Sequence, residues 1–246
     1  MNLLLLAAGS GESFRDAGHQ YPKNLVEIEG QPILQRSIEN VRPMVGADGR
    51  LVVIVRREEN LRYHTDAVAR LVAPEVKICQ ISGATAGAAC SALLAIDSID
   101  ETQPLVIANG DQVIEADLTA AIADFQRRGL DAGTIVFEDV HPRWSFVKCN
   151  AEGLVIEAAE KCPISRLATA GIYYFARGAD FVRAAMRMIL KDAHHDGIFF
   201  VCPVFNELLL ENARIGVFQI PRNAYFSLAT PQGAVTYTDH LHQRSR

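Results

Sequence analysis

Residues 3–11 read Leu-Leu-Leu-Leu-Ala-Ala-Gly-Ser-Gly, four leucines that pass through two alanines into a Gly-x-Gly turn. A short, uninterrupted apolar run is typical of a strand that is buried on both faces of a sheet. The glycines that follow admit backbone torsions that other residues avoid, so the turn can bring backbone amides close to an anion. This stretch predicts an α/β sheet whose first strand ends at a candidate ligand-binding turn.

The glycine turn differs from the two commonest nucleotide-binding loops. It lacks the G-x-G-x-x-G spacing of a dinucleotide-binding loop, and we expect no helix directly after it. It also lacks the Gly-Lys-Ser/Thr of a Walker loop. On its residues alone, the turn is either an anion-binding loop or an ordinary connection.

Short apolar runs alternate with amphipathic segments through the first half of the chain. We expect further buried strands at 51–55, 76–81 and 105–108, and helices at 33–41, 61–71, 88–96 and 118–128. This alternation predicts an α/β sandwich with a mostly parallel sheet.

The pattern changes after about residue 130. Strand-like segments follow one another without intervening helices at 133–137, 146–149, 154–158 and 171–175, so we expect mixed or antiparallel strands there. Helices are then predicted from 179 to about 191 and from Pro203 onward. No repeat or linker divides the sequence, which favours one domain. We expect a loosely held tail at 236–246, with His240 and His242 exposed or unstructured.

The composition is that of an ordinary globular protein, with 49% hydrophobic and 22% charged residues. The 24 Lys and Arg against 29 Asp and Glu leave a formal net charge of −5, which argues against a nucleic-acid partner. Five cysteines without a C-x-x-C pair predict free thiols in a reducing compartment. No apolar run approaches the ~20 residues of a membrane span, so we expect a cytoplasmic protein with no membrane partner.

Two charged residues stand where a phosphate site would need them. Lys23 follows Pro22 shortly after the glycine turn, and it is either a solvated surface charge or a cation that completes a polyphosphate site. Asp111 follows the apolar run 105–108, at the end of a predicted strand, where ligands bind in open α/β sheets. A carboxylate there can hold Mg²⁺ or simply cap the next helix.

Other polar and aromatic residues have simpler interpretations. His194 and His195 read as a surface pair at a helix end, with a substrate loop as the alternative. We expect Trp144 to pack in the core or at its edge, and stacking of its ring on a base or sugar is the less favoured alternative. The run Arg56-Arg57-Glu58-Glu59 reads as a solvated turn after a strand.

A series of short segments extends over almost the whole chain, from Leu3 to about Pro231. They are Gly9-x-Gly11, Pro22-Lys23 with Leu25, Gly30-Gln31-Pro32-Ile33, Gly87-Ala88-Ala89, Ala108-Asn109-Gly110-Asp111-Gln112, Glu160-Lys161-x-Pro163, Gly171-Ile172-Tyr173-Tyr174-Phe175 and Val201-Cys202-Pro203. In this order they resemble the sugar-phosphate nucleotidyltransferases (nucleoside-diphosphate-sugar pyrophosphorylases), and they look like the branch found in capsule and surface-polysaccharide clusters.

The resemblance implies a fold and an activity. The fold is a GT-A-like, Rossmann-like three-layer α/β sandwich with a central mixed, mostly parallel sheet. The activity is Mg²⁺-dependent transfer of NMP from an NTP to a sugar 1-phosphate or a similar small phosphorylated metabolite, with release of pyrophosphate, for surface-polysaccharide precursor synthesis. Residues 1–130 would form the nucleotide-binding half and residues 131–235 the acceptor-binding half, and homo-oligomerisation is left open.

The resemblance also implies roles for residues of the nucleotide half. Lys23 would bind the triphosphate and stabilise the charge that develops during transfer, and Asp111 would hold Mg²⁺ between the phosphates. Such a reaction depends on positioning and charge neutralisation more than on a protein nucleophile. The residues that would contact the nucleotide are Ala8, Gly9, Gly11, Gln80, Gly87, Asn109 and Gly110, with Gln80 and Gly87 at the base edge.

In the acceptor half, the resemblance implies that Glu160 contacts the acceptor's hydroxyl groups and Lys161 its phosphate. Gly171 would let the acceptor ring approach the backbone.

Two positions depart from the family pattern. The family's turn reads G-x-G-x-R, and Ser13 stands at the arginine position, so Arg15 is the residue that would have to reach the phosphates. Losing a charge-assisted phosphate contact costs a few kcal/mol, enough to slow turnover by ~10²-fold. Ser227 replaces a late aspartate that serves many members as a second metal ligand.

Two alternatives to nucleotidyl transfer stay open: a degenerate homologue that only binds nucleotide or NDP-sugar, and a GT-A glycosyltransferase.

Overall fold

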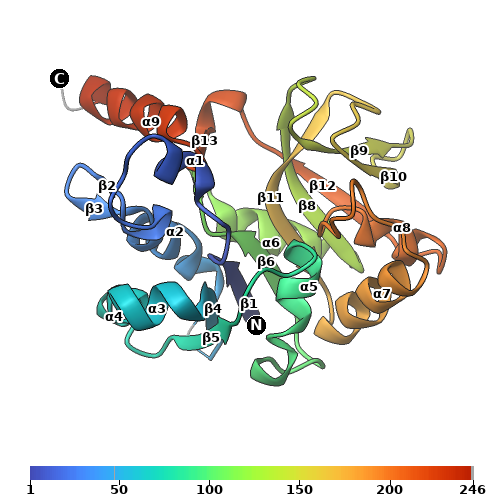
Figure 1. Cartoon of the computed structure of the whole chain (residues 1–246). Helices are drawn as coiled ribbons and strands as arrows, with labels where there is room; N and C mark the ends of the chain where they lie inside the picture. The colour runs from blue at the N-terminus through green and yellow to red at the C-terminus, as the bar shows by residue number, and fades with distance from the viewer. Residues whose placement is uncertain (47, 245–246) are drawn as a thin grey trace.

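A nine-stranded sheet runs through the middle of the computed structural model, which describes residues 1–46 and 48–244 (Figure 1). The strands lie in the order β10 (Val155–Glu160), β9 (Ser145–Cys149), β11 (Leu167–Phe175), β6 (Leu105–Asn109), β1 (Asn2–Leu6), β4 (Arg50–Arg56) and β5 (Lys77–Ile81). Off this path, β8 (Ala132–Glu138) pairs with β11, and β12 (Ile215–Gln219) pairs with β8.

The strands β5, β4, β1 and β6 are parallel, with β1 between β4 and β6. Leu3 pairs with Leu51 on one side and Val106 on the other, and all three are buried. β11 runs antiparallel to β6, β8 and β9, which makes the sheet mixed. The predicted mixed, mostly parallel sheet is confirmed.

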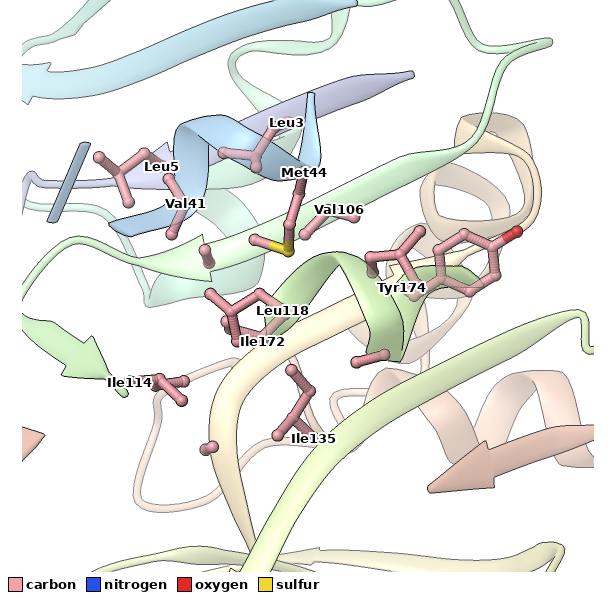
Figure 2. Packing of buried hydrophobic residues seen from close by; sticks show 14 of the residues in the cluster. Leu3, Leu5, Val41, Met44, Val106, Ile114, Leu118, Ile135, Ile172 and Tyr174 are labelled. Carbon is pink, nitrogen blue, oxygen red and sulfur yellow. The ribbon is translucent and has the colours of Figure 1, made fainter. Parts of the chain in front are cut away.

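Helices cover both faces of this sheet because successive side chains of a strand point to opposite sides. Leu3 and Leu5 belong to one hydrophobic cluster (Figure 2). Leu4 belongs to a second cluster on the opposite face. The first cluster contains residues of α2 (Ile33–Val41), η2 (Arg42–Met44), α4 (Thr65–Val72) and α6 (Leu118–Arg127). The second contains residues of α5 (Ala88–Leu93), α7 (Gly178–Leu190) and α8 (Val204–Leu209). The fold is therefore a three-layer α/β sandwich, as predicted.

A third, smaller cluster joins segments near the carboxyl ends of β1 and β6. It contains Phe14 of α1 (Glu12–Asp16), Val113 of β7 (Gln112–Ile114) and Tyr237 of α9 (Pro231–Arg244). β7 pairs with β13 (Tyr225–Ser227), and β2 (Glu27–Ile28) with β3 (Gln31–Pro32). The C-terminal helix α9 thus packs beside the N-terminal α1 (Figure 1). Short 3-10 turns complete the elements: η1 (Lys23–Leu25), η3 (Ile96–Ser98) and η4 (Arg222–Ala224).

Three sequence-based predictions about local structure are wrong. The helix expected at 61–71 is two helices, α3 (Arg57–Tyr63) and α4, because His64 has a φ of 53° that breaks the helical hydrogen bonding. Helix α1 begins directly after Gly11, and the burial of Phe14 in the third cluster holds it there. The expected tail continues α9 as far as Arg244, where Tyr237 is buried and His240 Nε2 lies 3.0 Å from Glu115 Oε2.

The last two residues of that expected tail, 245–246, lie outside the described part of the chain. Within the described part, no helix has the length and the apolar character needed to cross a membrane.

Candidate active site

The glycine turn, Lys23 and Asp111 meet at the carboxyl edge of the sheet. β1 and β6 are parallel neighbours with Leu6 opposite Asn109, so the residues that follow the two strands emerge side by side. Lys23, in η1, places its Nζ 2.5 Å from Asp111 Oδ2. The Lys23 side chain is 8% exposed and that of Asp111 is 24% exposed, so the pair lies partly sheltered from water.

Lys23 lies close against both glycines of the turn. A Cβ on Gly9 would lie 3.0 Å from Lys23 Nζ. A Cβ on Gly11, which has a φ of +59°, would lie 3.0 Å from Lys23 Cβ. The turn therefore wraps the lysine, and its ammonium group is held against the backbone of residue 9.

Arg15 and Ser13 lie on different sides of α1. Arg15 Nη1 donates a hydrogen bond to Ser10 O at 2.5 Å, so this exposed arginine holds the outside of the glycine turn. Ser13 Oγ donates to Ala229 O at 3.3 Å. The Ser13 side chain is therefore directed to the segment that follows β13, and the Arg15 side chain is directed to the glycine turn.

Arg56 is a residue that sequence reasoning missed. It ends β4, and its Nε donates to Ala8 O at 2.9 Å, so its side chain crosses to the glycine turn. The solvated turn expected at 56–59 is confirmed only in the exposure of Arg57 and Glu58, because α3 begins at Arg57 and Arg56 is partly buried. The signal that could have found it is an arginine at the carboxyl end of a strand predicted to be buried, the edge where ligands bind.

Glu59 of α3 lies close to the cations around the turn. Burial raises the pKa of the Glu59 carboxyl. The positive charges of Arg56, Lys23 and Arg15 oppose that rise, so all three cations act on one half-buried carboxylate. Three cations gathered around a glycine turn suit a polyphosphate.

The positions expected at the base edge lie on the β5 side of the turn. Gln80 is exposed on the edge strand β5, opposite Val55 of β4. Gly87 precedes α5 with a φ of +124°, and a Cβ there would lie 2.4 Å from Phe199 O. Ala89 N also donates to Phe199 O at 3.0 Å, so the segment at Gly87 is tightly bound to the chain around Phe199.

Asp111 and Ser227 are neighbours, although 116 positions separate them in the sequence. Gln112 of β7 pairs with Ser227 of β13, and Leu228 N donates to Asp111 O at 2.7 Å. Across residues 1–46 and 48–244, no group of three or more His, Cys, Asp or Glu side chains is arranged to hold a metal ion. A cation at Asp111 would take its other ligands from substrate oxygens and water, a shell that Mg²⁺ accepts.

Gly110 and Gly171 bring the neighbouring strands close to Asn109. Gly110 N donates to Leu6 O at 2.9 Å, and a Cβ on Gly110 would lie 2.8 Å from that oxygen. Gly171 has a φ of +64°, and its Cβ would lie 2.3 Å from Asn109 Nδ2. Gly171, expected in the acceptor half, therefore lies against Asn109 of the nucleotide half.

Glu160 ends β10 as a nearly buried carboxylate. It is 8% exposed, and its Oε2 accepts a hydrogen bond from Ser145 Oγ at 2.5 Å. Burial raises its pKa, while the Ser145 hydrogen bond and the charges of Lys161 and His195 act in the opposite direction. Lys161 has a φ of +51°, and its Nζ lies 5.2 Å from the centre of the Phe200 ring.

Buried polar side chains to which the sequence analysis assigned no role lie close to Glu160. Tyr173 OH lies 2.9 Å from Thr169 Oγ1. Burial raises the pKa of Tyr173 and of the Cys202 thiol well above their ordinary values, and the charge of Glu160 adds to both rises. Tyr173 and Cys202 are therefore neutral groups close to Glu160, and the hydrogen bond that holds the Glu160 carboxylate comes from Ser145.

A cavity of about 1140 Å³ opens beside β13. Its lining includes Trp144, Tyr225, Ser227 and Thr230. Trp144 packs edge-on against Tyr225, with ring centres 5.4 Å apart, which confirms the packing interpretation. Neither His194 nor His195 lines this cavity: His194 is exposed and its Nδ1 accepts from Gly197 N at 2.9 Å, whereas His195 is half-buried and its charge acts on Glu160.

Sequence comparison relates the chain to known proteins. A family model described as "Nucleotidyl transferase" matches residues 2–207. The UTP–glucose-1-phosphate uridylyltransferase AglF of Haloferax volcanii is 30% identical over 181 residues, which cover 71% of this chain and 72% of that protein. The bifunctional protein GlmU of Methanocaldococcus jannaschii is 30% identical over 178 residues, which cover 71% of this chain and only 40% of that protein.

Structural comparison agrees with these matches at the level of the fold. A nucleoside-diphosphate-sugar pyrophosphorylase from Vibrio cholerae RC9 superposes with a TM-score of 0.82 at 23% sequence identity, and the match covers 97% of this chain and 100% of that one. UDP-glucose pyrophosphorylase complexed with UDP-glucose superposes with a TM-score of 0.76 at 15% identity, over 99% of this chain and 98% of that one.

Proposed function

Because the chain belongs to the nucleotidyl transferase family, we propose that it transfers NMP from an NTP to a sugar 1-phosphate or a similar small phosphorylated metabolite. The observation that supports this most directly is the Lys23–Asp111 pair beneath the glycine turn, where β1 and β6 end. It brings together a cation, a carboxylate of the kind that Mg²⁺ prefers and the backbone of the glycine turn within one small region. We further propose that the reaction depends on Mg²⁺ and that the product is a precursor of a surface polysaccharide.

In this reaction a phosphate oxygen of the acceptor attacks the α-phosphorus of the NTP. A new P–O bond forms, the bond between the α-phosphorus and the bridging oxygen breaks, and pyrophosphate leaves with that electron pair. Lys23 stabilises the charge that grows on the phosphates, because its ammonium group is already fixed under the turn. Mg²⁺ held by Asp111 would neutralise part of the same charge.

The acceptor half supplies groups suited to a hydroxylated phosphate ester. Glu160 accepts a hydrogen bond from Ser145 through Oε2, and no side chain or backbone group of the described residues donates to its Oε1. A fixed carboxylate with a free oxygen accepts hydrogen bonds from hydroxyl groups. Lys161, the next residue, offers a positive charge for the acceptor phosphate.

A second candidate function is binding of nucleotide or NDP-sugar without turnover. Ser13 favours it, since its hydroxyl faces Ala229 and leaves no cation at that position. Ser227 beside Asp111 also replaces a charged metal ligand by a neutral one. A GT-A glycosyltransferase is less well supported, because only Gly110-Asp111-Gln112 stands where such enzymes usually carry Asp-x-Asp.

The first test is thermal unfolding of the whole chain with ATP, CTP, GTP, UTP or dTTP, each with and without Mg²⁺, and with NDP-sugars for comparison. A ligand at 100 times its Kd adds ~2.7 kcal/mol, a rise of roughly 5–10 °C for a chain of this size. Stabilisation by one triphosphate that deepens with Mg²⁺ supports the proposal. Stabilisation by NDP-sugars alone favours binding without turnover, and no stabilisation by any nucleotide refutes both.

The second test measures pyrophosphate release with the stabilising NTP and a panel of sugar 1-phosphates and other phosphorylated acceptors. Lys23→Ala should lower kcat by ~10²-fold or more, because the charge it neutralises develops in the transition state. Asp111→Asn should abolish Mg²⁺-dependent turnover. Wild-type kcat in either variant would remove that residue from the proposed role.

A further inference from the structure

Arg56 lies on the side of the glycine turn opposite Asp111. In the sheet, β1 is flanked by β6, which leads to Asp111, and by β4, which ends at Arg56. Arg56 Nε donates to Ala8 O at 2.9 Å. This bond draws the guanidinium group from the end of β4 onto the backbone of the turn.

Arg56 and Lys23 contact consecutive residues of the turn. Arg56 contacts Ala8, and Lys23 Nζ lies against Gly9. The two cations therefore lie beside consecutive residues of the same turn. A polyanion that receives hydrogen bonds from the amides of this turn lies within reach of both.

The two cations differ in how their charge is balanced. Lys23 is paired with Asp111 at 2.5 Å. Arg56, in contrast, forms no salt bridge within residues 1–46 and 48–244, although it is partly buried; its charge acts on the Glu58 and Glu59 carboxyls without a direct contact. Its Nη1 and Nη2 groups likewise have no hydrogen-bond partner in that part of the chain.

One hydrogen bond orients this guanidinium group and leaves its remaining donors unused. Such a group is preorganised to bind a planar or tetrahedral oxyanion. Arg15 is a weaker candidate for this task because it is exposed and holds the outer side of the turn at Ser10 O. We infer that Arg56 binds the triphosphate of the nucleotide substrate through its Nη groups. This inference rests on the proposed function, and it assigns the phosphate-binding arginine of the site to the end of β4.

The test compares Arg56→Gln and Arg56→Lys with Arg57→Gln in the full chain. Arg57 is a matched control, since it is the next residue, is exposed at the start of α3 and carries the same charge. The probes are the NTP that most stabilises the wild type and its nucleoside, which lacks phosphates. Their Kd values are measured by calorimetry without an acceptor.

Arg56→Gln should weaken binding of the NTP by about 10- to 100-fold, because a charge-assisted phosphate contact is lost, and should leave nucleoside binding unchanged. Arg56→Lys should retain part of the affinity because it keeps the charge. Arg57→Gln should bind both ligands as the wild type does. Raising the salt concentration should weaken NTP binding less in Arg56→Gln than in the wild type.

Unchanged NTP binding in Arg56→Gln would overturn the inference. An equal loss of NTP and nucleoside binding would also overturn it, because Arg56 would then contact the base or only shape the turn. If Arg56→Gln does not fold, Arg56→Lys decides: a nucleoside affinity lowered as much as the NTP affinity counts against phosphate binding. Failure of the wild type to bind any NTP would instead refute the proposed function.

Discussion

Gly171 allows β11 to pass close to the end of β6, and replacing it should be costly. Its φ is +64°, and an added Cβ would lie 2.3 Å from Asn109 Nδ2 and 2.7 Å from Gln112 Oε1. Gln112 cannot move freely, because it is 2% exposed and its Oε1 accepts a hydrogen bond from Tyr225 OH at 3.3 Å.

The cost of Gly171→Ala has two parts. A left-handed backbone costs a residue with a Cβ ~1 kcal/mol. Displacing the Asn109 and Gln112 side chains breaks hydrogen bonds of a buried group, which costs a further ~1–3 kcal/mol. The sum is ~2–4 kcal/mol, or a fall in Tm of roughly 4–16 °C at 2–4 °C per kcal/mol.

Thermal unfolding with a matched control isolates the cost of displacing the Asn109 and Gln112 side chains. Gly153 also has a positive φ, +74°, but a Cβ there would meet nothing within 4 Å. Gly153→Ala therefore carries only the backbone cost, and its Tm should fall by ~2–4 °C. If Gly171→Ala unfolds at the same temperature as Gly153→Ala, the close approach of β11 to Asn109 does not constrain the site, and the reasoning is refuted.

Two further predictions concern single side chains. Burial raises the pKa of Glu160 in the folded protein, so its charge opposes folding above that pKa and has no effect below the ordinary value of 4.5. Glu160→Gln should accordingly raise Tm at pH 7, with the gain disappearing as the pH falls toward 4.5; a gain that is independent of pH would contradict this. Ser13→Arg should change kcat by less than ~3-fold, because Arg56 already places a guanidinium group at the turn. A rise in kcat of ~10-fold or more would show that Arg15 and Arg56 do not supply the phosphate contact.

The central strands could be predicted from local sequence alone. The runs at 3–6, 51–55 and 105–108 are confirmed as β1, β4 and β6, because a strand covered by helices on both faces must be apolar at nearly every position. The resemblance of short ordered motifs was also sufficient to identify the family, which the match over residues 2–207 confirms.

Local reasoning failed where distant packing stabilises a segment. Helix α1 is only five residues long and has weak intrinsic stability, yet the burial of Phe14 against the C-terminal part of the chain holds it. The same contacts order α9, through Tyr237 and the His240–Glu115 pair. A window of sequence contains no information about a partner more than 200 residues away.

On its residues alone, the sequence pointed to Lys23 and Asp111 separately, and the family resemblance placed both at the phosphates of one site. The tertiary structure decided that these residues, 88 positions apart, form one pair. It also decided that Arg56 joins them at the turn and that Ser145 holds Glu160. The physical reason is the order β6-β1-β4 in the sheet, which arises from hydrogen bonds between strands distant in sequence and leaves no local pattern in any of them.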